Sequence, residues 1–111
     1  MKSIFATVVL AATLATPLAS FAAGDAVAGK DLYMKKCASC HGQNGEGKDA
    51  IAEQLKIKFK HLGSKDVQAK TDADLKKGIV EGTGKMKAVK DMDAKAVDDV
   101  LAFVRTLKAP K

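Results

Sequence analysis

The sequence predicts an all-α fold, and three observations carry that prediction. Apolar residues recur at three- and four-residue intervals in several segments, which is the spacing of one helix face. Glycines separate these segments and mark the breaks between helices. No run of β-branched or aromatic residues is long enough to supply the strands of a central sheet. We therefore expect three or four helices and no strand in this chain of 111 residues.

Residues 1–22 are predicted to be a secretory signal peptide that is cleaved after Ala22. Lys2 gives a positively charged start, an apolar run follows, and small residues lie where a signal peptidase reads the chain. The rival interpretation is a retained membrane anchor, but the apolar run is short and Pro17 interrupts it. Cleavage would leave residues 23–111 as one domain in the periplasm, with no segment able to span a bilayer.

The first helix is expected over residues 26–40, with Asp25 as a favourable N-cap. Gly29, Tyr33 and Cys37 follow one another at four-residue steps and so share one face. A glycine inside a helix costs about 1 kcal/mol relative to alanine. Close approach of a second helix at Gly29 would offset that cost.

A glycine-rich loop and two short segments come next. Three glycines mark a loop over residues 42–47. Two apolar residues four positions apart suggest a short helix over residues 49–56. Ser64 is expected to cap a short turn over residues 65–69.

Thr71 begins a pattern that resembles a capping box and predicts a helix over residues 72–81. Gly82 ends this helix, and an extended, glycine-rich loop is expected over residues 82–86.

The last helix has the clearest pattern. Asp93 is its expected N-cap, and Phe103 lies on the edge of its apolar stripe. The stripe repeats at helical spacing through Val97, Val100, Leu101, Val104 and Leu107.

One short motif carries the chemistry of this sequence: Cys37, Cys40 and His41 form the pattern C-x-x-C-H. This pattern is typical of covalent haem attachment. Each thiol can add to one vinyl group of the haem, and the adjacent imidazole can then ligate the iron. The sequence therefore predicts one haem c, bound through thioethers at Cys37 and Cys40 and ligated axially by His41.

Three other interpretations of the cysteine pair are weaker. A zinc site needs more ligands, yet the chain has only two cysteines and two histidines. A thioredoxin-like redox motif needs βαβ units, which the pattern does not indicate. A disulfide would close a very small loop and so stabilise the fold little.

The composition of the mature chain is consistent with a large buried cofactor. Once the leader is removed, Tyr33, Phe59 and Phe103 are its only aromatic residues. A domain of this size is marginal on its own, and a macrocycle would add apolar volume to the core. The formal net charge of +6 falls to +5 without Lys2. That charge suits brief encounters with an acidic partner as well as it suits plain solubility, and the lack of an arginine cluster argues against nucleic acid.

The second axial ligand decides whether the iron is closed or open to small molecules. Met86 is the preferred candidate, because it lies 45 residues after His41 and shortly after Gly82 and Gly84, which allow the backbone close to the ring. His61 is the main rival, and an open site is the third possibility. Met34 and Met92 are interpreted as packing residues.

Taken together, these motifs resemble a small bacterial class I cytochrome c over essentially the whole mature chain. The matching residues are Gly29 and Tyr33, the C-x-x-C-H motif, the segment Gly84-Lys85-Met86, and residues 99–103 of the last helix. The resemblance implies three to four helices wrapped around one covalently bound haem. It also implies that the first and last helices cross, with Gly29 against Phe103.

The chain departs from that family pattern in its prolines. Many relatives have a proline after the ligand methionine, where Lys87 stands here, and another whose carbonyl accepts a hydrogen bond from the ring N–H of the axial histidine. Residues 23–109 contain no proline, so no residue of the sequence is identified as that acceptor.

The expected function is single-electron transfer in the periplasm, without enzymatic activity of its own. The partners would be redox proteins with an acidic docking face, steered by lysines around the haem edge: Lys35, Lys36, Lys48, Lys85, Lys87 and Lys90. The alternatives are a haem-based binder or sensor of small ligands and a haem subunit of a larger redox enzyme.

Overall fold

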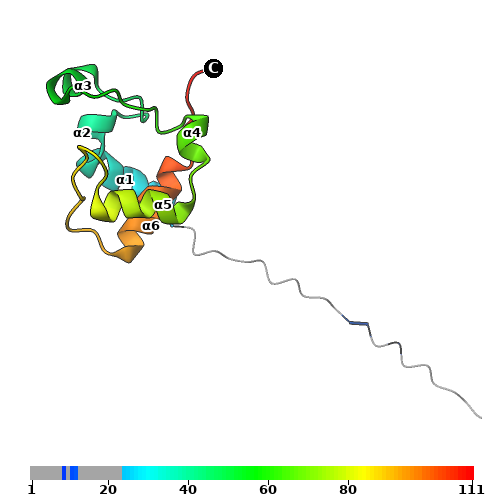
Figure 1. Cartoon of the computed structure of the whole chain (residues 1–111). Helices are drawn as coiled ribbons and strands as arrows, with labels where there is room; N and C mark the ends of the chain where they lie inside the picture. The colour runs from blue at the N-terminus through cyan, green and yellow to red at the C-terminus, as the bar shows by residue number, and fades with distance from the viewer. Residues whose placement is uncertain (1–8, 10, 13–23) are drawn as a thin grey trace, which may run out of the picture.

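The computed structural model describes residues 9, 11, 12 and 24–111, so the predicted signal peptide lies almost wholly outside the described residues. Six helices follow one another along residues 24–111 (Figure 1): α1 (Ala26–Lys36), α2 (Ala38–His41), α3 (Asp49–Leu55), α4 (Lys65–Gln68), α5 (Asp72–Glu81) and α6 (Ala94–Val104). This part of the chain contains no strand, only one isolated bridge between Thr83 and Met86. The all-α prediction is confirmed, with α2 and α4 as single turns beside four longer helices.

Helices α1 and α6 form the main helix–helix contact of the fold. Gly29 makes this contact possible, because a Cβ at this position would overlap the backbone carbonyl oxygen of Asp99. The resemblance implied Phe103 as the partner of Gly29. The atoms closest to Gly29 belong to the backbone of Asp99 and Val100, about one helical turn before Phe103.

Phe103 packs on Tyr33, with the two ring centroids 5.0 Å apart. Tyr33 and Val100 are fully buried, and Ala38 and Val104 complete the cluster around them. The core therefore lies between α1, the start of α2 and the inner face of α6. The apolar stripe predicted for the last helix is confirmed as far as Val104, where α6 ends, and Leu107 packs against the core from beyond the helix.

A break at Cys37 divides the single helix that was expected over residues 26–40. Cys37 has φ −119°, well away from the helical value, and α2 begins at the next residue. The phenol of Tyr33 donates a hydrogen bond of 2.6 Å to the carbonyl oxygen of Gly42, just beyond α2. This hydrogen bond holds the end of α2 close to α1. In one continuous straight helix these two residues would lie too far apart to form it.

The predicted helix caps are present. Asp25 accepts hydrogen bonds from the first turn of α1, and Asp93 accepts one from Ala96 at 2.8 Å. Ser64 and Thr71 cap α4 and α5 through their hydroxyl oxygens. Local sequence therefore sets where these helices begin.

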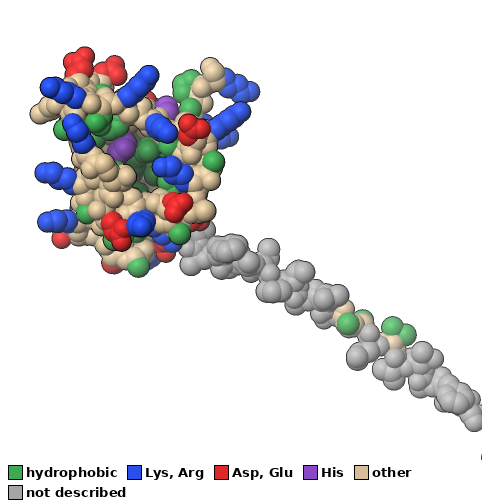
Figure 2. Space-filling view, in the orientation of Figure 1, with side chains coloured by type: hydrophobic (Ala, Val, Ile, Leu, Met, Phe, Trp, Pro, Cys, Tyr) green, Lys and Arg blue, Asp and Glu red, His purple; other side chains and the backbone are tan. Residues whose placement is uncertain are grey.

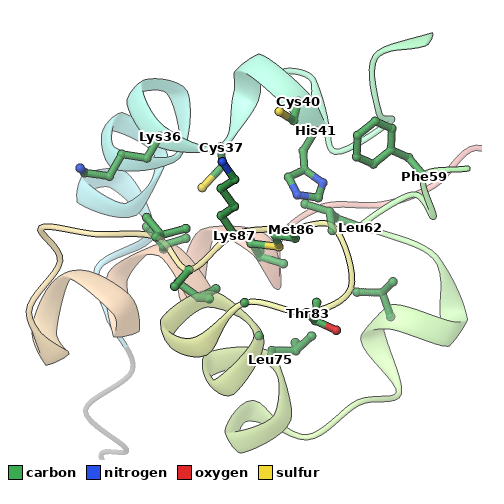
Figure 3. A pocket seen from close by; sticks show the side chains of 18 of the residues that line it. Lys36, Cys37, Cys40, His41, Phe59, Leu62, Leu75, Thr83, Met86 and Lys87 are labelled. Carbon is green, nitrogen blue, oxygen red and sulfur yellow. The ribbon is translucent and has the colours of Figure 1, made fainter. Parts of the chain in front are cut away.

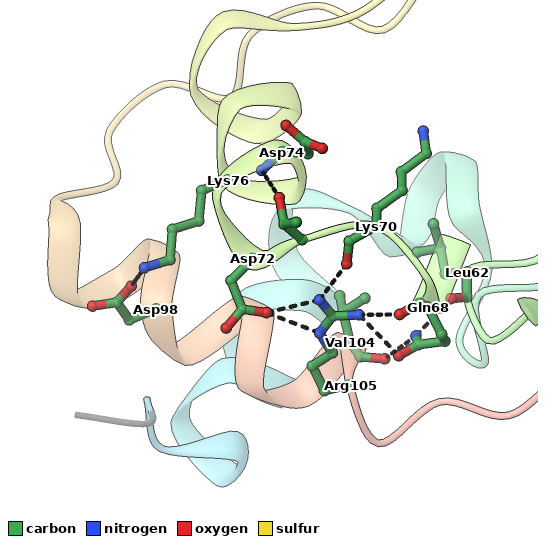
Figure 4. A network of polar contacts seen from close by, with 10 residues as sticks. Leu62, Gln68, Lys70, Asp72, Asp74, Lys76, Asp98, Val104 and Arg105 are labelled. Carbon is green, nitrogen blue, oxygen red and sulfur yellow. Dashed lines mark hydrogen bonds and ion pairs between the residues drawn. The ribbon is translucent and has the colours of Figure 1, made fainter. Parts of the chain in front are cut away.

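Arg105, the only arginine, links three elements at the end of α6 (Figure 4). Its guanidinium donates to the Asp72 carboxylate at 2.7 Å and to the backbone carbonyls of Gln68 and Lys70. The Gln68 amide in turn donates to the carbonyl of Leu62 at 2.8 Å. This network fixes α4 and the start of α5 against α6, and α5 forms part of the wall of the site.

Among the described residues, no helix is both long enough and apolar enough to cross a membrane.

Candidate haem site

A cavity of about 1190 Å³ opens between α2, the segment 55–62, α5 and the loop 82–91. Figure 2 shows it as a hollow with hydrophobic side chains at its base and lysines around its edge. Its volume exceeds that of most pockets for drug-sized ligands, about 300–1,000 Å³. The cavity is large and apolar enough for a macrocycle.

Cys37 and Cys40 both line this cavity, are half-buried and form no disulfide (Figure 3). Cys37 directly precedes α2 and Cys40 lies within it, so both thiols lie on one wall of the cavity. Burial raises the pKa of Cys37 to about 11. Thiol–disulfide exchange depends on an accessible thiolate, which a lowered pKa would favour. The raised pKa therefore argues against a thioredoxin-like redox role.

His41 projects from the end of α2 into the same cavity. Burial lowers its pKa, which favours the neutral imidazole that a metal requires. Its Nδ1 atom is buried without a hydrogen-bond partner among the described residues. The ring of Phe59 packs against it at a centroid distance of 5.4 Å.

Met86 lines the cavity from the loop that follows α5, and Figure 3 shows its sulfur and the His41 ring in the same space. This loop is a tight turn, so the extended path predicted for residues 82–86 is wrong. Thr83 and Met86 exchange two backbone hydrogen bonds of 3.0 and 2.9 Å. Gly84 has φ +54°, which a turn of this kind requires and glycine readily supplies.

Lys85 connects the same turn to the segment after α3. Its ammonium donates to the carbonyl oxygen of Leu55 at 2.6 Å. The turn is thus held at both sides, by the Thr83 pairing and by Lys85. A stiff turn can hold a methionine ligand even though no proline follows it.

The rival ligands lie elsewhere. His61 does not line the cavity, and its Nδ1 accepts a hydrogen bond of 2.9 Å from the backbone of Gly63. Met34 and Met92 are partly buried and pack against the core cluster, as predicted. Of the four candidates for the second ligand, the structure brings only Met86 into the cavity with His41.

The lysines at the cavity edge are partly those expected from the sequence. Lys36, Lys85, Lys87 and Lys90 line the cavity, whereas Lys35 and Lys48 do not. The sequence analysis missed four further lysines of the lining: Lys58, Lys60, Lys70 and Lys77. Two aspartates, Asp74 and Asp91, are the only acidic residues of the lining, so the rim is strongly positive.

These residues fit a haem. Two thiols, a neutral imidazole and a thioether converge on one apolar cavity, which is the donor set of covalent attachment with nitrogen and sulfur ligation. No group of three or more His, Cys, Asp and Glu side chains that could hold a separate metal ion lies within the described part of the chain.

Phe59 is the residue of the site that sequence reasoning missed. It was noted only as one of three remaining aromatics, yet it contacts the ring of His41. Its place in an alternating segment of lysines and apolar residues was the one available signal, since alternation turns every second side chain to the same side.

Comparisons with known proteins agree with this geometry. The family model for cytochrome c matches residues 26–108. The chain is 35% identical over 94 residues to cytochrome c-554(547) of Halothiobacillus neapolitanus, covering 78% of this chain and all of that protein. Among solved structures, the KustC0563 c-type cytochrome matches with a TM-score of 0.62 and 27% identity, over 73% of this chain and 98% of its own.

Proposed function

The chain belongs to the cytochrome c family and its cofactor is haem c, and from this premise we propose that the mature protein is a periplasmic carrier of single electrons and not an enzyme. The observation that supports this most is the meeting of four suitable side chains in one apolar cavity: the two thiols of the C-x-x-C-H motif, the imidazole of His41 and the thioether of Met86.

Each of these residues has a distinct role in the proposal. Cys37 and Cys40 anchor the haem through thioether bonds, so that the cofactor cannot dissociate. His41 and Met86 would ligate the iron, one through nitrogen and the other through sulfur. When bound, the haem supplies an iron that alternates between the ferrous and ferric states and so carries one electron at a time.

The stiffness of the two ligand segments supports rapid transfer. His41 lies on a helical turn tied to α1 through Tyr33, and Met86 lies in a turn tied to Leu55 through Lys85. Ligands held in this way keep their positions when the charge of the iron changes. Little reorganisation is then needed for each electron.

The positive rim of the cavity supports a partner with an acidic docking face. Eight lysines line the cavity and only two aspartates do. Complementary charge speeds the encounter of such partners and is screened by salt. Export to the periplasm rests on residues 1–22, with their positively charged start and short apolar run.

Carbon monoxide titration of the reduced protein tests the proposal. If Met86 closes the sixth position, carbon monoxide leaves the absorption spectrum unchanged at neutral pH. Met86→Ala opens that position, so this variant is expected to bind the gas. Met34→Ala is the matched control, because Met34 packs on the core, and it is expected to stay unresponsive. Ready binding by the unmodified protein would favour a ligand binder or sensor and contradict the carrier.

A further inference from the structure

The Nδ1 atom of His41 presents an unusual situation for a metal ligand. A histidine that ligates a metal almost always donates its other ring N–H to a carboxylate, a carbonyl or water, which fixes the ring and raises its basicity. In this chain Nδ1 is buried and has no acceptor among residues 24–111. Some other contact has to orient the imidazole.

Phe59 provides that contact. Its ring meets the His41 ring at an interplanar angle of 61° with centroids 5.4 Å apart, an edge-to-face arrangement. Such an arrangement restricts rotation of the imidazole about its bond to Cβ. The Phe59 side chain has no oxygen or nitrogen atom that could accept a conventional hydrogen bond from the buried Nδ1–H.

Gly47 fixes the two partners relative to each other. Its backbone N–H donates to the carbonyl oxygen of His41 at 2.6 Å. Its Cα lies so close to Phe59 that a Cβ at position 47 would overlap that side chain, and its φ of +80° suits glycine. One residue therefore holds both the backbone of the histidine and the base of the aromatic ring.

We propose that Phe59 is a positioning residue for His41, which fixes the imidazole and seals Nδ1 from water in place of a hydrogen-bond acceptor. The inference rests on the proposed ligation of the haem iron by His41. An imidazole without an acceptor gives less electron density to the metal than one with an acceptor, because the hydrogen bond raises ligand basicity. The arrangement therefore favours the ferrous state and raises the reduction potential.

Two readouts on the haem-loaded protein test this: the exchange of the His41 Nδ1–H with water by NMR in the ferrous state, and the reduction potential. Phe59→Ala admits water to Nδ1, so exchange is expected to accelerate about tenfold or more, and the potential to fall. Phe59→Val removes less apolar cover and is expected to give a smaller change in the same direction. It keeps the inference testable if the alanine variant does not fold.

Leu75→Ala is the matched control, since Leu75 lines the cavity on α5, away from His41 (Figure 3). It is expected to leave the exchange rate of Nδ1–H unchanged. The inference is overturned if both Phe59 variants keep the exchange rate and the potential of the parent, or if Leu75→Ala accelerates the exchange of Nδ1–H as much as they do.

The same spectra separate this inference from the ligand assignment. Ring protons of His41 that lie under the haem are strongly shifted by its ring current. If they have ordinary shifts, His41 is not the ligand and the proposed function loses its ligand set. If they are shifted while the Phe59 variants change neither readout, only the positioning role of Phe59 fails.

Discussion

The phenol of Tyr33 donates a hydrogen bond of 2.6 Å to the carbonyl oxygen of Gly42, and so joins α1 to the residue directly after His41. Tyr33 is fully buried, and burial raises its pKa well above the ordinary value, which keeps the phenol protonated as a donor. The backbone at Gly42 also accepts from Gly45 at 3.3 Å. The helix core and the haem motif thus share one buried polar contact.

Tyr33→Phe tests this link. The substitution removes one hydrogen bond and keeps the ring that packs on Phe103, so the free energy of unfolding is expected to fall by about 1 kcal/mol. Urea unfolding of the haem-loaded protein measures it. An unchanged unfolding midpoint would mean that the bond contributes nothing.

Gly29→Ala tests the close approach of α1 and α6. The added methyl overlaps the carbonyl of Asp99, so the unfolding free energy is expected to fall by about 1–3 kcal/mol. Gly78→Ala is the comparison within α5: among the described protein atoms its added Cβ meets only Thr83, at 3.8 Å, and Gly78 lines the cavity. This comparison is expected to lower the unfolding free energy less than Gly29→Ala, because its added methyl meets no backbone atom. Similar effects of the two substitutions would contradict the close contact at Gly29.

Asp99→Asn tests a buried carboxylate at the same helix crossing. Asp99 accepts from the Lys95 ammonium at 2.8 Å and from the backbone of Asp25 at 2.7 Å, and these bonds lower its pKa from the ordinary 3.8. A lowered pKa in the folded state means that the carboxylate stabilises the fold above pH 3.8 and loses this effect as the pH falls through the folded value.

The unmodified protein is therefore expected to be more stable than Asp99→Asn at pH 7, with the difference shrinking below about pH 4. Urea midpoints of both proteins at pH 7 and at pH 3 measure this. A difference that stays constant, or that grows toward low pH, would show that the charge of Asp99 is not what stabilises the crossing.

Lysine substitutions on and off the cavity test the positive rim. Lys58 and Lys87 are exposed and line the cavity, whereas Lys30 and Lys111 are exposed and do not. Replacing the first pair by glutamine is expected to slow electron transfer with an anionic reagent such as hexacyanoferrate, by about two- to tenfold at low salt. Replacing Lys30 and Lys111 by glutamine removes the same charge, but is expected to slow electron transfer less. Equal effects would indicate that only the net charge matters.

Local signals in the sequence predicted the helix starts and the haem motif well, for physical reasons. Asp25, Ser64, Thr71 and Asp93 each cap the helix expected of them, because capping depends on residues within one turn. The spacing of Cys37 and Cys40 is equally local. Features that depend only on residues close together in the sequence can be predicted without knowing the tertiary structure.

Contacts between distant segments could not be predicted in the same way. The break at Cys37 accompanies the bond from Tyr33 to Gly42, and the approach to Gly29 comes from the backbone of Asp99. The path of residues 55–62 brings Lys58 and Lys60 to the cavity and Phe59 to His41. A helical pattern of apolar residues predicts which face of a helix is buried, but not which residues of another segment pack against that face.

The central claim is that His41 and Met86 ligate one covalently held haem iron, and the absorption spectrum of the oxidised protein tests it most directly. We predict a sulfur-to-iron charge-transfer band in the parent protein that is lost in Met86→Ala, with the haem still attached in both. A parent protein without the band, or a Met86→Ala variant that retains it, would contradict this account of the site.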